Sequence, residues 1–129
     1  MTNKLMIAAA FSALIAPAAL AQTSNYGNET KTAATHAGLA AQAGDLKTVQ
    51  MHLHHALNCL EGPSGKDFDQ SNANPCAKMG KGALTDANPA QAAQLQTAIT
   101  TLNNGVATTD LATAKKDGTT AAADINKAM

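Results

Sequence analysis

Apolar residues recur at helical spacing in four stretches of this chain, and no stretch alternates as a half-buried strand does. The clearest stretch covers residues 46–60, where six apolar residues share one helical face: Leu46, Val49, Leu53, Ala56, Leu57 and Leu60. An alanine-rich helix is predicted before it, from Lys31 to Ala43. Between the two, Gly44 suits a helix end and Asp45 suits an N-cap. The pattern predicts a helical hairpin with a very short turn.

Two further helices are predicted in the C-terminal half. The third begins after Asn88, an N-cap followed by proline, and is expected to end near Asn103 at an Asn-Gly pair. The fourth begins near Asp110 and contains Gly118, a weak point because glycine disfavours helix. The four helices predict an all-α fold, an up-down four-helix bundle.

Two segments lack helical periodicity. Residues 22–30 are polar and are predicted to form a loose leader. Residues 61–88 are rich in Gly, Pro and Asn, which predicts a long loop between the second and third helices. A loop of that length is uncommon unless it is functional or held in place.

The N-terminal residues 1–21 have the three zones of a secretory signal peptide. A lysine precedes an apolar run at 5–15, and an Ala-Leu-Ala cleavage motif ends at Ala21. The alternative, a short N-terminal anchor helix, is disfavoured by Pro17. We therefore expect a bacterial periplasmic protein, exported through the Sec pathway, with a single mature domain at 22–129. No mature segment approaches the roughly 20 apolar residues that span a bilayer.

Composition predicts a thin core for this domain. Only 14 of the 108 residues after Ala21 are Leu, Ile, Val or Phe, whereas 22 are Ala. A domain this small and this poor in large apolar side chains needs further stabilisation, from a cross-link, a metal, a cofactor or a second subunit in a homodimer. The chain has no Arg, and its lysines and acids balance, so it offers no basic surface for nucleic acid.

The two cysteines, Cys59 and Cys76, are a candidate cross-link. An even pair in an oxidising compartment predicts a disulfide, which would fasten the 61–88 loop to the end of the second helix. Closing a loop of this size contributes about 3 kcal/mol in the chain-entropy estimate. The alternative is a pair of thiolate ligands for a metal.

All four histidines lie in the first hairpin. His52 and His55 are three residues apart and so share one side of their helix. His36 lies eight residues before Gly44 and His52 eight after it, so an antiparallel hairpin places them level. His36 also shares its stripe with Leu39 and two alanines, which we expect to face inward. His36, His52 and His55 can therefore converge on a Zn, Cu or Ni ion with one open position.

Other candidate ligands are less well placed in the pattern. His54 points away from His52, which suits a surface ligand or a residue behind the ligands. Met51 and Met79 suit a site only if the metal is soft, as Cu(I) is, or if haem is bound. The alternative for the methionines is core packing. For the histidines it is an ordinary core or solvated position.

Residues 35–58, with the motifs HA (36–37), AQAGD (41–45) and HLHHAL (52–57), resemble a helical hairpin of the small periplasmic metal-binding proteins of nitrifying bacteria. The resemblance implies a four-helix protein that binds copper and other divalent metals. In that family histidines recur along every helix, whereas the last two predicted helices here contain none. One metal site is therefore the most that this chain suggests.

Three functions remain open on these grounds. The first is a periplasmic metal-binding protein, a carrier, buffer or sensor of copper or zinc. It would use His36, His52 and His55, and release the ion as pH falls through about 6. The second is a bundle that binds haem b without covalent attachment, because no C-x-x-C-H motif is present. The third is a structural or interaction module with no ligand. No nucleophilic constellation has evident geometry, so we do not expect an enzyme.

Overall fold

The computed structural model describes residues 25–129, and the predicted signal peptide lies outside the described residues. The chain folds into five helices: α1 (Tyr26–Gln42), α2 (Leu46–Glu61), α3 (Ala83–Asp86), α4 (Pro89–Ala107) and α5 (Leu111–Ala128). Residues 25–129 contain no strand, so the predicted all-α class is confirmed.

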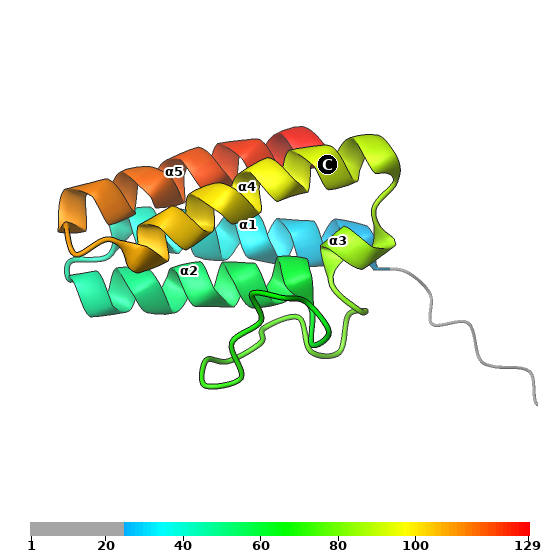
Figure 1. The fold of residues 1–129 in the computed structure, drawn as a ribbon, viewed down its shortest axis with the longest axis horizontal. Coiled ribbons are helices and arrows are strands. Elements are labelled where there is room, and N and C mark those ends of the chain that lie inside the picture. The colour runs from blue at the N-terminus through cyan, green and yellow to red at the C-terminus, as the bar shows by residue number, and fades with distance from the viewer. Residues whose placement is uncertain (1–24) are drawn as a thin grey trace, which may run out of the picture.

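The four long helices lie side by side and alternate in direction (Figure 1). Each contacts two others closely: α1 packs against α2 and α5, and α4 packs against the same two helices. The short α3 lies at one end of the bundle, where the irregular segment 62–82 leads from α2 toward α4. Within the described residues, no helix is both long and apolar enough to cross a membrane.

Three of the helices start where the sequence predicts, because their caps are local. Asp45, Asn88 and Asp110 each accept a hydrogen bond on a side-chain oxygen from the backbone N–H three residues later. At Asn88 the capping box is complete, since the Gln91 side chain accepts from the Asn88 backbone N–H. These bonds satisfy N–H groups that the first helical turn leaves without partners.

The first helix is longer than predicted. It begins at Tyr26 rather than near Lys31, so the expectation of a loose leader is wrong for residues 26–30. The Tyr26 hydroxyl donates to the Ala128 carbonyl at 2.7 Å, which ties this turn to the end of α5. Glu29 and Thr30 are fully buried despite being polar. Tertiary contacts therefore extend the helix over residues that read as a polar leader.

Two other boundaries also differ. α4 continues through the predicted Asn-Gly stop to Ala107. Gly105 is buried inside that helix, where an added Cβ would lie 2.8 Å from Leu53 Cδ1 of α2. The glycine thus serves a close helix contact rather than a helix end. In addition, α3 forms within the segment that was predicted to be loop.

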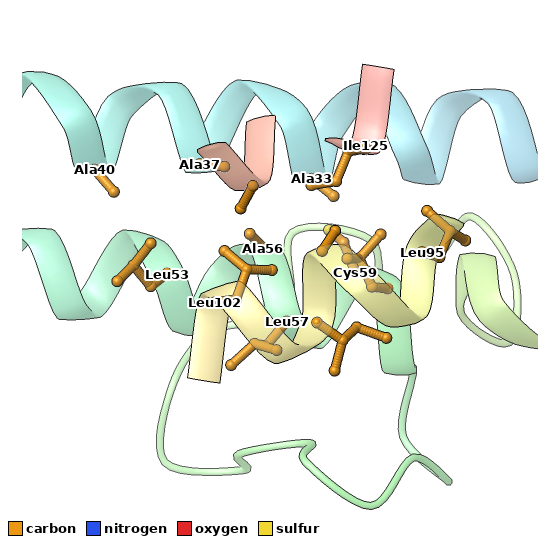
Figure 2. Close-up of a cluster of buried hydrophobic side chains, with 14 of the residues drawn as sticks. Ala33, Ala37, Ala40, Leu53, Ala56, Leu57, Cys59, Leu95, Leu102 and Ile125 are labelled. Carbon is orange, nitrogen blue, oxygen red and sulfur yellow. The ribbon is translucent and has the colours of Figure 1, made fainter. Parts of the chain in front are cut away.

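Small side chains form much of the core between α1 and its neighbours. Ala33, Ala37 and Ala40 are fully buried on α1 and face α2 (Figure 2). Leu39, which was expected to face inward, is 39% exposed, so that expectation is wrong. The large apolar side chains that are fully buried come from the other three long helices, and they include Leu53, Leu57, Leu60, Leu95, Ile99, Leu102 and Ile125.

Cys59 and Cys76 form the predicted disulfide, and both are buried. The two sulfurs are bonded to each other, so the alternative of a thiolate metal-ligand pair is wrong. The cross-link closes a loop with a sequence separation of 17. A loop of that size gives about 3 kcal/mol in the chain-entropy model, a large share of the stability of a small domain.

A second anchor of the loop, Asn58, has no counterpart in the sequence prediction. It is fully buried, and its Nδ2 donates to the backbone carbonyls of Asp69, Asn72 and Ala73. Its Oδ1 accepts from the Asp69 backbone N–H at 2.9 Å. One side chain thus replaces the secondary-structure hydrogen bonds that this part of the loop lacks.

Candidate metal centre

Three of the four histidines converge between α1 and α2. His36 comes from α1, and His52 and His55 come from successive turns of α2. One nitrogen from each ring can be chosen so that all three lie within 4.8 Å of one another. The Nδ1 atoms of His36 and His52 are 3.2 Å apart, and the ring centroids of the three residues are 5.0 to 5.8 Å apart. The histidine cluster predicted from the sequence is therefore present.

The backbone explains why these rings meet. The turn between α1 and α2 contains only residues 43–45, so positions equally far from Gly44 lie level. Ala33, Ala37 and Ala40 on α1 are fully buried and point toward α2, and such small side chains let two helices approach closely (Figure 2). Because the two helices approach closely, the imidazole rings of His36 and His52 contact each other across the α1–α2 interface.

The environment of the cluster favours neutral imidazoles. Burial lowers the pKa of His36, and the neighbouring His55 and His52 lower it further. Burial also lowers the pKa of His55, with smaller contributions from His52 and His54. A neutral imidazole keeps the lone pair that a metal ion needs, whereas a protonated one does not.

Hydrogen bonding within the cluster is incomplete. Two ring nitrogens 3.2 Å apart can share only one proton, so His36 and His52 supply at least one lone pair at this point. The buried Nδ1 of His55 has no hydrogen-bond partner among the described residues. A metal ion would give these nitrogens the partner that the protein does not provide.

His54 and Met51 both line a cavity of about 570 Å³ that also includes Asn72 and none of the three converging histidines. The His54 Nδ1 lies 3.4 Å from Asp69 Oδ2. Hydrogen bonds from Ser71 and Asn72 lower the Asp69 pKa to about 2, so this carboxylate stays ionised beside His54. His54 thus faces a carboxylate of the loop. Met51 is 38% exposed and lies one helical turn before His55 on α2.

Met79 lies against α1 on the side that carries His36. Its sulfur accepts a hydrogen bond from the Thr32 hydroxyl at 3.8 Å, and its half-buried side chain packs against the core. It belongs to the irregular segment that the disulfide fastens, three residues after Cys76.

Glu29 is a buried acid that the sequence prediction missed. Its Oε1 accepts from the Gly82 N–H at 3.0 Å, whereas its buried Oε2 has no hydrogen-bond partner within residues 25–129. Burial raises its pKa, the Gly82 hydrogen bond opposes that rise, and nearby Asp86 adds to it. A signal was available, because Glu29 continues the alanine stripe of α1 backward by one turn from Ala33.

Comparisons with protein-family models, with curated proteins and with solved structures found no match for this chain. Its function is therefore inferred from its own side chains.

Proposed function

We propose that this chain is a periplasmic metal-binding protein that carries, buffers or senses a transition-metal ion such as copper or zinc. The observation that supports this proposal most directly is the convergence of His36, His52 and His55, with one nitrogen from each ring within 4.8 Å of the other two. The signal-peptide pattern at residues 1–21 supports export to the periplasm. We propose a binding protein rather than an enzyme.

Three imidazoles suit Zn and Cu and leave a further coordination position open. An open position allows the ion to be handed to another protein without unfolding of the site. Because the pKa values of His36 and His55 are lowered, the rings stay neutral and competent to bind over a wider acidic range than free histidine. In this proposal the long helices form an up-down bundle, and the disulfide-fastened loop covers the site.

The haem alternative has less support from the geometry. Two imidazoles that ligate one haem iron lie on opposite faces of the porphyrin. Here the rings of His36 and His52 are packed against each other, with centroids 5.5 Å apart. The described rings therefore leave no slot for a porphyrin between them.

Metal analysis of the full chain, exported and purified from periplasm, tests the proposal. We expect about one equivalent of tightly bound copper or zinc, which the double variant His36→Gln/His52→Gln loses. The matched control is His54→Gln, which removes an imidazole of the same helix outside the cluster and should retain the metal.

Three results would contradict the proposal. A Soret band in the purified protein would favour haem. Equal metal loss in His54→Gln would show that the histidines bind without a defined site. Absence of stoichiometric binding in the wild type, with stability unchanged in the double variant, would favour a structural module.

A further inference from the structure

A methionine sulfur lies one helical turn from the histidine cluster. Met79 Sδ accepts from the Thr32 hydroxyl at 3.8 Å. Thr32 and His36 are four residues apart, so they are neighbours on one face of α1, about 6 Å apart along the axis. Side chains on a helix lean toward its N-terminus. Thr32 and the sulfur therefore lie on the N-terminal side of His36, the side toward which helical side chains lean.

The disulfide fixes how far along the helices this sulfur lies. Cys76 is bonded to Cys59 of α2, and its sulfur is 3.9 Å from the Glu29 carbonyl of α1. The Met79 backbone N–H donates to the Cys76 carbonyl at 2.9 Å. Met79 is thus one tight turn away from a cross-link that joins this segment to α2 and lies against α1.

Along the bundle axis, the Met79 sulfur lies near Thr32, between the disulfide and the level of His36 and His52. On α1, Thr32 lies one turn before His36. On α2, which is antiparallel, His55 lies one turn before Cys59. Thr32 and His55 therefore lie at about the same height along the two helices, one turn from the disulfide. Met79 lies at this height too, against Thr32 of α1.

The contact with Thr32 leaves the sulfur available to a metal. Other threonines of α1 donate their hydroxyl to the carbonyl four residues earlier, as Thr30 and Thr35 do. Thr32 can make the same bond, so it loses no hydrogen bond if Met79 turns to an ion. A thioether selects soft ions such as Cu(I), whereas imidazoles alone also suit Zn(II) and Cu(II).

We propose that Met79 Sδ joins His36, His52 and His55 as a fourth ligand and makes the site selective for Cu(I) over Zn(II). This inference rests on the proposed metal site and adds the class of ion that the site prefers. The disulfide serves the site by holding the methionine against α1.

Competition titrations on the full purified chain test the assignment. Cu(I) affinity is measured without oxygen against a chromophoric Cu(I) chelator, and Zn(II) affinity against a chromophoric zinc indicator. The test variant is Met79→Leu, which keeps the size and apolarity of the side chain but removes the sulfur. The matched control is Met51→Leu, because Met51 is an exposed methionine one turn before His55 that lines the cavity beside His54.

We expect Met79→Leu to weaken Cu(I) binding by about ten-fold or more, the scale on which even outer partners of metal ligands act. Zn(II) affinity should be unchanged within error, and Met51→Leu should match the wild type for both ions. X-ray absorption of the Cu(I)-loaded wild type should show a sulfur neighbour that Met79→Leu lacks. The disulfide is present in both proteins, so it cannot account for the difference.

Several outcomes would overturn the assignment. Unchanged Cu(I) affinity in Met79→Leu would remove Met79 from the site. Equal weakening for Cu(I) and Zn(II) would show that Met79 only supports the loop. A larger effect of Met51→Leu would place the soft ligand elsewhere. Failure of the wild type to bind either ion would instead overturn the proposed function, which separates the two conclusions.

Discussion

At Gly118, α5 lies so close to α1 that a side chain has no room. An added Cβ would be 2.9 Å from the Ala37 carbonyl oxygen and 3.2 Å from both Ala40 Cβ and Ala41 N. Two of these neighbours are helix backbone, which cannot rotate away, so α1 and α5 must separate or bend. Overpacking of this kind costs about 1–3 kcal/mol. Alanine recovers about 1 kcal/mol of helix propensity over glycine. We expect Gly118→Ala to destabilise the protein by up to about 2 kcal/mol.

Gly38 provides the matched control, because it is also helical but no atom of the part of the chain that the structure describes lies within 4 Å of an added Cβ. There the propensity gain acts alone, so Gly38→Ala should stabilise the protein by about 0.5–1 kcal/mol. The same chemical change is therefore expected to have opposite signs at the two positions.

Urea unfolding of the disulfide-intact protein, followed by far-UV circular dichroism, measures both effects. For a small domain the slope is about 1–3 kcal/mol per molar urea, so the two midpoints should differ by about 1 M. The slopes should match, because neither change alters the surface that unfolding exposes. A higher midpoint for both variants would refute the close α1–α5 contact as the role of Gly118.

Two further predictions concern pH. Because the pKa values of His36 and His55 are lowered in the folded state, the unfolded metal-free chain binds more protons below about pH 6.5. The melting temperature of the metal-free protein should therefore fall on acidification from that pH. In the double variant His36→Gln/His55→Gln this fall should be smaller. An equally steep fall in the variant would contradict this reasoning. The pKa of Glu29 is raised, so the folded protein binds that proton more tightly, and stability decreases as pH rises through the raised value. Glu29→Gln keeps the acceptor for the Gly82 N–H but removes the buried charge. It should therefore raise the free energy of unfolding by about 1 kcal/mol at neutral pH and have little effect in acid. Destabilisation at neutral pH would contradict the raised pKa of Glu29.

The histidine cluster could be predicted because it follows from regular geometry. The spacing of His52 and His55 and the equal distances of His36 and His52 from Gly44 depend only on helix periodicity and turn length. The same holds for α2, whose six-residue apolar face defines the helix to within one residue at its end. In these parts local pattern and tertiary structure agree.

Elsewhere tertiary contacts decide, and the local pattern does not report them. The start of α1 depends on burial of Glu29 and on the bond from Tyr26 to Ala128, which is 102 residues away. Leu39 shows a second cause: in an alanine-rich helix with few large side chains, the sequence does not mark which stripe faces inward. The anchoring of the loop by Asn58 depends on backbone carbonyls whose positions no sequence pattern gives.

The thin core and the histidine cluster have a common physical origin. α1 has small side chains toward both neighbours: Ala33 and Ala37 point toward α2, and the Ala40 side chain lies beside Gly118 of α5. Close approach of the backbones brings His36 to within 3.2 Å of His52. Larger residues on this face would bury more apolar area and would also move α1 away from α2, which would separate the two rings. Between α1 and α2, larger core side chains and converging histidines therefore exclude each other. The disulfide and the loop held by Asn58 supply the stability that this interface lacks.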